Sequence, residues 1–522
     1  EVAAMLAGER VVLGGRLVPV ADRPDLAVRH VAARLLVDEV GAAEPGDVVS
    51  RVANGLRRAV VGGAGSLGPD ATALLTGICF GDDRAQAAAV RDDFRAAGLT
   101  HLLAVSGQNV VFVLLVAGPL LRRLGLGSRL VTVLVLLGFF ALLTRFEPSV
   151  LRATAMAGIA AVHQAAGRPS ERARTLALAV TVLLLVDPVL VRSVGFALSV
   201  GATAGILAWA PGLTARLPGP RWLAEPLAVT LAAQVAVAPL LVLVFGGVPL
   251  VALPANLLAG PAAGLVMAWG LVAGPLAGLL VGAAPAAGGV VAAALHVPDR
   301  LALAWLHAVA ERAGAVPLGE LGAPHLFLLA VAVGTAWWVR RGDRRPVALA
   351  VAGAVGVATL AAPGLVLARR PPLIGREVAT GAEVWRAGDA VVVRLDGRAR
   401  AGPVLAGLRR VGVRRVGLVL VSGSSASDGD LVEALTRRAR PAVASAAEDE
   451  RLVVGPFTAE ALAPGRWLVR IAPGAAGSVR SAGARRARPP PLRRHPPAGR
   501  GRRRWGRGRP GGGRGRRRGA RP

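Results

Sequence analysis

Residues 102–368 form an almost unbroken series of apolar segments, which constrains the fold more than any other feature of the sequence. A helix that spans a bilayer needs about 20 mostly apolar residues. Hydrophobic residues make up 53% of the 522-residue chain and charged residues only 18%. A soluble helical core of this length needs far more polar faces. The pattern therefore predicts a polytopic α-helical integral membrane protein with roughly eight to ten transmembrane helices.

The candidate spans are Leu102–Leu121, Leu130–Leu143, Val150–Ala166, Thr175–Val191, Val194–Ala210, Pro226–Phe245, Val248–Ala284, Val290–Ala310, Phe327–Val339 and Val347–Leu367. The segment 248–284 is long enough for one broken helix or two. We assign residues 102–310 to the main membrane domain and residues 311–370 to additional transmembrane helices.

Arginines in alternate loops give an orientation. They follow the first, third and fifth spans and gather again after residue 339, at Arg122, Arg123, Arg129, Arg168, Arg172, Arg174, Arg216, Arg221, Arg340, Arg341, Arg344 and Arg345. Loops rich in arginine stay in the cytoplasm. This predicts a multi-pass protein of the bacterial cytoplasmic membrane. Its N-terminal domain, and with an odd number of later spans its C-terminal domain, face outward.

The flanking segments differ from the membrane region. Residues 1–60 contain a turn at Asp22–Pro24 that is followed by short apolar runs at Val31–Val40 and Val48–Val52, which predicts a small β-rich extracytoplasmic domain. The chain starts at Glu1 without a methionine, so we expect this domain to be truncated. Residues 61–101 have helical spacing with mixed polarity, which indicates amphipathic lead-in helices at the membrane surface or packed on the bundle. Residues 371–479 regain an α/β pattern.

The last segment, residues 480–522, holds 17 arginines and no acidic residue. All 62 basic residues of the chain are arginines, and the net charge is +30. Such an Arg/Gly/Pro segment is expected to be disordered. It could bind nucleic acid nonspecifically, form a solvated tail or be translated out of frame. We leave it out of the mechanism.

Residues 94–110 read Phe-Arg-Ala-Ala-Gly-Leu-Thr-His-Leu-Leu-Ala-Val-Ser-Gly-Gln-Asn-Val. This stretch resembles the signature of the ComEC family, polytopic competence proteins thought to pass single-stranded DNA across the cytoplasmic membrane. Further elements agree in order: Asn54–Arg57, Leu74–Gly77, Gly81–Asp82, Pro148–Ala153, Asp187–Pro188, Gly195–Ser199, Gln234, Pro239, Phe245–Gly246 and Asn256. The resemblance covers residues 50–310 and implies a competence-type channel domain there.

The resemblance also bears on the two end domains. It implies that the N-terminal β-domain is oligonucleotide-binding-like and that residues 371–479 are metallo-β-lactamase-like. The metal motif of that domain departs from the family pattern, because the sequence offers Asp428 and Asp430 and no histidine between His325 and His495. A zinc site needs converging imidazole and carboxylate ligands. With only Cys79 as a thiol, we expect a degenerate domain, no metal, no cofactor and no enzymatic activity.

Polar residues inside apolar spans are the candidate site residues, because intramembrane polar groups are costly and usually face a bundle interior or an aqueous path. Ser106, Gly107, Gln108 and Asn109 fall within the first candidate span. They could line a DNA path or tie helices together. Arg152 could meet a passing phosphate. Alternatively, it snorkels to the interface or pairs with a nearby carboxylate.

Three further residues complete the candidate set. His101 lies at the membrane entrance, where it is either a structural group or a mechanistic one. Gln234 and Asn256 are amides in apolar spans near prolines, and broken helices often line sites in transporters. Prolines are also common in membrane helices without such a role.

The sequence and the resemblance together predict a channel for the passage of single-stranded DNA during natural transformation. Its expected partners are DNA, the lipid bilayer, a DNA receptor, a cytoplasmic ATPase and a possible second copy of the chain. No Walker A motif is possible without lysine, so any pulling force comes from elsewhere. The alternatives are a small-solute transporter, a serine hydrolase using Ser106 with His101 or His163, and a non-functional truncated relic.

Overall fold

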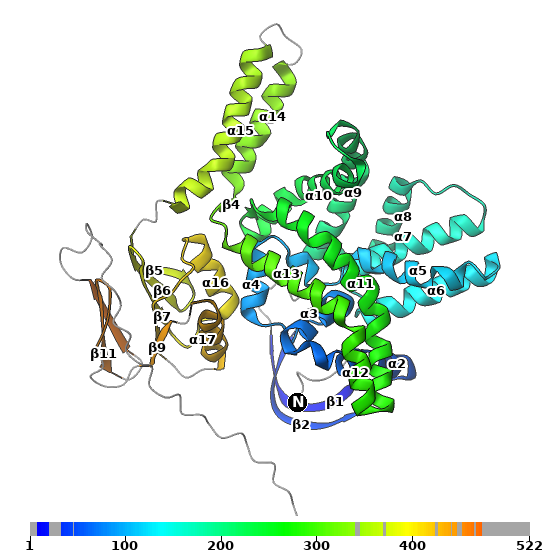
Figure 1. The fold of residues 1–522 in the computed structure, drawn as a ribbon, viewed down its shortest axis with the longest axis horizontal. Coiled ribbons are helices and arrows are strands. Elements are labelled where there is room, and N and C mark those ends of the chain that lie inside the picture. The colour runs from blue at the N-terminus through cyan, green and yellow to red at the C-terminus, as the bar shows by residue number, and fades with distance from the viewer. Residues whose placement is uncertain are drawn as a thin grey trace, which may run out of the picture. The chain divides into compact units, whose positions relative to one another are not determined.

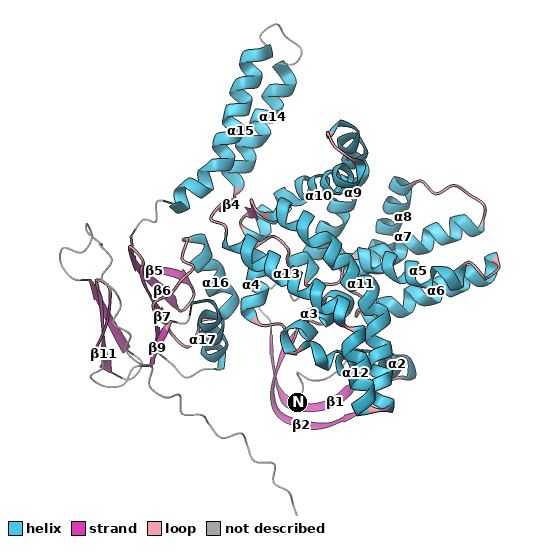
Figure 2. Cartoon of the chain, in the orientation of Figure 1, coloured by secondary structure: helices cyan, strands magenta, loops and turns pink. Residues whose placement is uncertain are grey.

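A computed structural model describes residues 8–19, 33–44, 46–339, 345–368, 372–422, 426–439, 441–445, 451–463 and 466–471. Helices dominate, and strands lie toward both ends of the chain (Figures 1 and 2). All of these residues belong to one compact unit. The prediction of a mostly helical chain with apolar helices and some β structure is confirmed. Residues 480–522 lie outside the described residues.

The N-terminal segment is a β-hairpin followed by a helix. Strands β1 (Arg10–Pro19) and β2 (Ala33–Glu44) pair antiparallel. Helix α2 (Val48–Gly63) begins after Asp47, whose carboxylate accepts the Ser50 N–H at 2.7 Å. The expectation that the apolar run Val48–Val52 belongs to the β-domain is therefore wrong. Asp47 caps a helix there, and the buried residues of α2 recur at helical spacing.

The lead-in helices pack inside the bundle, which is one of the two placements we predicted. Helix α3 (Pro69–Phe80) has every residue from 73 to 80 buried. It ends at Gly81, whose φ of 73° suits a glycine at the end of a helix. Helix α4 (Ala88–Ala96) and the short 3₁₀ helix η3 (Thr100–Leu102) follow. These elements bring the chain to the first apolar helix.

Seven helices make up the next part of the bundle: α5 (Gly107–Leu121), α6 (Leu126–Leu143), α7 (Pro148–Ala165), α8 (Arg172–Val186), α9 (Val194–Arg216), α10 (Arg221–Phe245) and α11 (Ala252–Ala283). The short 3₁₀ helix η2 (Ala64–Leu67) connects α2 to α3, and η4 (Pro188–Arg192) connects α8 to α9. Helix α11 presents small buried residues, including Ala255, Ala259 and Ala263, to its neighbours. Small residues let helix backbones approach closely in apolar surroundings.

Beyond α11 the chain breaks and turns. Helices α12 (Pro285–Leu295) and α13 (Val297–Ala315) are bent by 52° about His296. Two-residue strands, β3 (Val248–Pro249) and β4 (Glu320–Leu321), pair with each other. Helices α14 (Ala323–Val339) and α15 (Arg345–Ala368) then lie side by side (Figure 1).

The described residues contain five helices long and apolar enough to cross a membrane, or six if the bent α12–α13 pair is one span. The predicted eight to ten spans exceed this number. Two apolar segments form short helices, α5 and α14, of 15 and 17 residues. Helix α8 has only 15 residues, and α7 carries several polar side chains. The segment predicted as one broken helix or two is the single continuous helix α11.

The C-terminal segment has the α/β pattern expected from the sequence. A five-stranded sheet has the order β5 (Leu373–Ala379), β6 (Ala382–Ala387), β7 (Ala390–Leu395), β8 (Leu418–Val421) and β9 (Ala442–Ser445). The last two pairings are parallel. Helices α16 (Ala401–Arg410) and α17 (Ala426–Ala439) pack with it, and β10 (Arg451–Val454), β11 (Phe457–Ala463) and β12 (Arg466–Ile471) form a second sheet. The side chains of Asp428 and Asp430 lie outside the described residues. The metallo-β-lactamase-like identity stays a prediction.

Candidate functional site at the start of α5

The end of α3 and the starts of α5 and α7 meet at one point in the bundle. The side-chain amide of Asn109 in α5 donates to the Ile78 carbonyl in α3 at 2.6 Å. Ser149 in α7 donates from its hydroxyl to the Val105 carbonyl at 2.8 Å. Segments separated by 31 and 44 residues in the sequence are thereby joined. Three of the elements that carry the family resemblance therefore form one cluster.

Ser106 begins α5 rather than lying within it, because its hydroxyl accepts the Gln108 N–H at 3.3 Å. A serine in this position caps one of the N–H groups that a helix leaves unpaired at its start. The predicted span from Leu102 therefore begins at Gly107 as a helix. Ser106 also hydrogen-bonds the Asn109 side chain at 3.2 Å.

Gly107 allows α7 to approach the start of α5. A Cβ atom at this position would lie 2.8 Å from Nη2 of Arg152 and 3.0 Å from Cβ of Ala153. Gly81 serves a similar purpose beside the same loop, since its Cβ would lie 2.9 Å from Cγ2 of Val105. Both glycines belong to the elements quoted for the resemblance, and both are explained by close packing.

Arg152 is held inside the protein and does not extend to an interface. Its residue is 8% exposed. Its Nε donates to the Ser199 hydroxyl of α9 at 2.9 Å, and its Nη1 contacts Sδ of Met156 at 3.1 Å. A guanidinium has five donors, so hydrogen bonds to neutral groups leave this cation able to attract an anion. Arg152 links α7 to α9 and borders Gly107.

Arg57 is a buried cation that the sequence analysis did not select. It lies on α2, is 5% exposed, and donates from Nη2 to the Leu143 carbonyl. Its Nε and Nη1 have no hydrogen-bond partner among the described residues. Burial and, to a smaller extent, the nearby Arg145 and Arg84 lower the pKa of the Arg57 guanidinium to about 10, although Asp82 acts in the opposite direction. The only sequence signal was its place in the Asn54–Arg57 element of the resemblance.

Two more arginines surround Asp82 beside Arg57. Arg84 pairs with Asp82 at 2.6 Å, and Arg145 lies 4.0 Å from the same carboxylate. Arg145 and Phe146 both have φ above 50°. Residues other than glycine rarely adopt this conformation, and it is found most often at sites that other contacts hold in place. The loop before α7 therefore places a cation next to the cluster.

The remaining predicted residues differ in their exposure and in their partners. Gln108 and His101 are exposed. Protein surrounds His101 at longer range and lowers the pKa of its imidazole by desolvation, although the Gly98 backbone opposes this. Asn256 on α11 donates to the Ala252 carbonyl at 2.8 Å and the Gly98 carbonyl at 3.4 Å.

Gln234 lies on α10, away from this cluster. Its Nε2 is buried without a partner among the described residues. The structure thus brings Ser106, Gly107, Gln108, Asn109 and Arg152 together. A role in lining a DNA path stays a prediction for each of them. The complete burial of Asn109 favours the alternative role, that of tying helices together.

A buried pair at the break between α12 and α13 was also missed. Nδ1 of His296 lies 2.8 Å from Oδ2 of Asp299, and both side chains are fully buried. Nε2 of His296 and Oδ1 of Asp299 have no partner among the described residues. The described residues contain no group of three or more His, Cys, Asp or Glu that could hold a metal ion.

The competence protein family model matches residues 78–341, which is half of the chain. This range includes Asp82, Ser106–Asn109, Arg145 and Arg152, but not Arg57. The chain belongs to the competence protein family. This confirms the resemblance to ComEC proteins that the signature indicated.

This competence protein is similar to two curated relatives over part of its length. It is 26% identical over 206 residues to the uncharacterized protein YcaI of Escherichia coli strain K12, covering 36% of this chain and 27% of that protein. It is 31% identical over 147 residues to ComE operon protein 3 of Bacillus subtilis strain 168, covering 28% of this chain and 19% of that protein. The matches thus span about a quarter or less of each relative. No solved structure matches the chain.

Proposed function

We propose that this competence protein passes single-stranded DNA across the bacterial cytoplasmic membrane during natural transformation. The observation that carries the proposal is that arginines border the elements that meet near the start of α5. Arg145 lies 4.0 Å from Asp82 with the buried Arg57 nearby, and the buried Arg152 borders Gly107. Cations held within or beside a bundle attract the phosphates of a passing strand. Membership of the competence family supports the same function.

We infer the entry side from one contact of the C-terminal domain and from the loop arginines. Arg409 of α16 pairs with Asp92 of α4 at 2.7 Å, so the C-terminal domain lies at the same end as the start of α5. The loop arginines predict that this end faces outward. DNA would then meet the cluster first and leave at the end where Arg122, Arg129 and Arg168 surround a cavity of about 710 Å³.

The strand is moved rather than cut in this proposal. The predicted loss of the metal ligands in the C-terminal domain makes this chain a conduit without nuclease activity. A DNA receptor and a cytoplasmic ATPase would deliver and pull the strand, and a second copy of the chain could complete the channel. These partners belong to the proposal.

Photo-crosslinking tests the path directly. The exposed Gln108 is replaced by a photoreactive phenylalanine in the full chain, and labelled DNA is supplied to competent cells. We expect a covalent adduct of this protein with single-stranded DNA. The matched control places the same group at Val135 of α6, which is 64% exposed on an apolar helix. Equal adduct yields at the two positions would contradict the proposal.

A small-solute transporter is the second candidate, and one observation favours it. The buried His296–Asp299 pair lies at the break of a bent helix pair. Broken helices and buried ionisable groups often mark substrate or ion sites in transporters. Flux of a solute into vesicles, with no effect of DNA, would support this alternative.

A further inference from the structure

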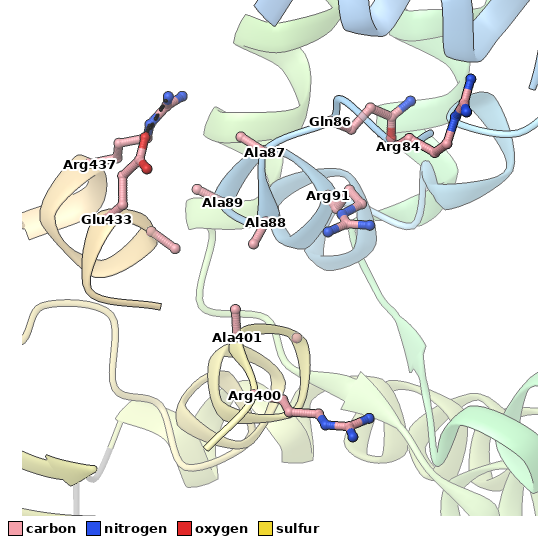
Figure 3. A pocket seen from close by; sticks show the side chains of 12 residues that line it. Arg84, Gln86, Ala87, Ala88, Ala89, Arg91, Arg400, Ala401, Glu433 and Arg437 are labelled. Carbon is pink, nitrogen blue, oxygen red and sulfur yellow. Dashed lines mark hydrogen bonds and ion pairs between the residues drawn. The ribbon is translucent and has the colours of Figure 1, made fainter. Parts of the chain in front are cut away.

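A cavity of about 480 Å³ lies between α4 and the two helices of the C-terminal domain, α16 and α17 (Figure 3). The charged side chains in its wall are Arg84, Arg91, Arg400, Arg437 and the single carboxylate Glu433. Cavities of about 300–1,000 Å³ are typical of small-molecule sites. The excess of arginine favours an anionic ligand of that size.

Two helix N-termini open onto the same space. Ala88, the first residue of α4, and Ala401, the first residue of α16, both line the cavity, and neither helix is capped by a side chain. In Figure 3, Ala87 and the first residues of α4 lie between Glu433 and Arg437 of α17 on one side and Ala401 of α16 on the other. The first N–H groups of a helix have no partner within it, and its dipole is positive there. Phosphates bind at such ends.

The cavity wall also holds Gln86, whose amide is engaged inside the bundle. Gln86 is 4% exposed and donates from Nε2 to the Leu103 carbonyl at 3.4 Å. Its Oε1 is buried and lies out of reach of a ligand in the cavity. The volume of the cavity, rather than this amide, leaves room for more of a nucleotide than its phosphate.

The arginines differ in their existing partners. Arg437 pairs with Glu433 at 3.0 Å and with Asp70 at 2.9 Å. Arg84 pairs with Asp82. Arg91 and Arg400 form no ion pair with the described residues and are therefore the main candidates for direct contact with a phosphate.

The two walls of the cavity are held together independently of any ligand. Arg409 of α16 bonds Asp92 of α4 at 2.7 Å and Glu320 of β4 at 3.1 Å. Asp92 is 2% exposed, so this contact is shielded from water. A site whose walls are already in place binds its ligand at a smaller entropic cost.

We propose that this cavity holds one nucleotide unit of single-stranded DNA. The phosphate lies against Arg91, Arg400 and the two helix N-termini, and the rest of the cavity takes the sugar and the base. This site rests on the proposed function and adds a holding point ahead of the α5 cluster. Arg84 connects the two, since it lines the cavity and pairs with Asp82 of that cluster.

The test measures binding to the purified full chain in lipid nanodiscs. The probes are thymidine monophosphate, a 20-nucleotide oligothymidylate and inorganic phosphate. The test variant combines Arg91→Ala with Arg400→Ala. Its matched control combines Arg95→Ala with Arg398→Ala, which removes exposed arginines of the same two segments that do not line the cavity.

We expect the test variant to bind both nucleotide probes at least about tenfold more weakly, because it loses two charged hydrogen-bond donors. The dependence of log affinity on log salt for the oligothymidylate falls by about 0.7, the value for the single phosphate contact that is lost. The control variant keeps the affinity and the salt dependence of the unmodified chain.

Two results would overturn the proposal. One is that the test and control variants bind thymidine monophosphate equally well. The other is that inorganic phosphate displaces the oligothymidylate as effectively as thymidine monophosphate does, which would reduce the site to a simple anion site. Binding in nanodiscs is measured without uptake. A failure of this site therefore leaves the proposed passage of DNA to be judged by uptake experiments in cells.

Discussion

The side-chain amide of Asn109 donates to the Ile78 carbonyl at 2.6 Å and joins the start of α5 to the end of α3 inside the bundle. The residue is fully buried. The neighbouring Gln108 is exposed on the same helix turn. Two adjacent amides of the family signature thus have different surroundings, one inside the packed bundle and the other at its surface.

This difference predicts unequal effects on stability. Asn109→Ala leaves the Ile78 carbonyl without its donor, at a cost of about 1–3 kcal/mol. We expect a lower thermal midpoint of the purified protein in detergent. Gln108→Ala is the matched control and leaves the midpoint unchanged. A larger loss for the Gln108 variant would mean that the contact to Ile78 does not hold the helices together.

Gly107→Ala tests the close approach of α7. The added methyl group meets Arg152 and Ala153 and forces the two helices apart, at about 1–3 kcal/mol for an overpacked contact. Both the thermal midpoint and DNA uptake fall. Gly138→Ala, on α6 with open space around it, leaves both unchanged. Normal uptake in the Gly107 variant would remove this contact from the mechanism.

Arg57 offers a test of function against stability. Its lowered pKa corresponds to about 3 kcal/mol of unfavourable burial at neutral pH, where the group is charged in both the folded and unfolded states. This cost is relieved only as the pH rises above about 10, where the folded protein releases the proton first. Arg57→Met removes the cost and loses the bond to Leu143, so the thermal midpoint stays or rises.

DNA uptake is nevertheless expected to fall in the Arg57→Met variant, because the cluster loses a cation. Arg58→Met, at the exposed neighbouring position, is the control for loss of charge alone. Unchanged uptake in the Arg57 variant, together with a higher midpoint, would show that Arg57 has no role in the path.

The buried pair at the α12–α13 break predicts a fourth effect. Asp299→Leu leaves Nδ1 of His296 without a partner and lowers the thermal midpoint, at about 1–3 kcal/mol for an unsatisfied buried group. Glu311→Leu removes an exposed carboxylate of the same helix and has little effect. The pair is structural only if the midpoint falls while uptake per folded molecule is unchanged.

Accessibility of the path can be measured through an introduced thiol. Cys79 is the only cysteine of the chain, it is fully buried, and burial raises the pKa of its thiol. A maleimide therefore reacts slowly with the unmodified protein. We expect Gln108→Cys to react quickly and Asn109→Cys to remain unreactive. Equal labelling of both positions would contradict the described surroundings.

The helical character of the membrane region could be predicted from the sequence because apolar segments report it directly. The helix limits could not. Ser106 begins α5 through its own hydroxyl, and Asp47 begins α2 inside a segment expected to be β. Capping by a single side chain decides such boundaries, and hydropathy does not register it. The number of spans was overestimated because α5, α8 and α14 are short helices and α7 carries several polar side chains.

The candidate site could be predicted only in part. The signature located Ser106–Asn109 and Arg152, because polar residues stand out in apolar segments. Arg57 lies in a mixed segment where arginine is unremarkable, and its bond to Leu143 crosses 86 residues. The cavity between α4 and α16 joins residues more than 300 positions apart. Only the tertiary packing brings such groups together.

The measurement that tests the central claim most directly is uptake of labelled duplex DNA by a transformable strain whose own channel gene is deleted. The strain carries either this protein or an empty vector, and surface-bound label is separated from nuclease-protected label. We predict equal surface binding in both strains and protected label only with this protein. Equal protected label in the two strains would contradict the claim that this protein passes DNA across the membrane.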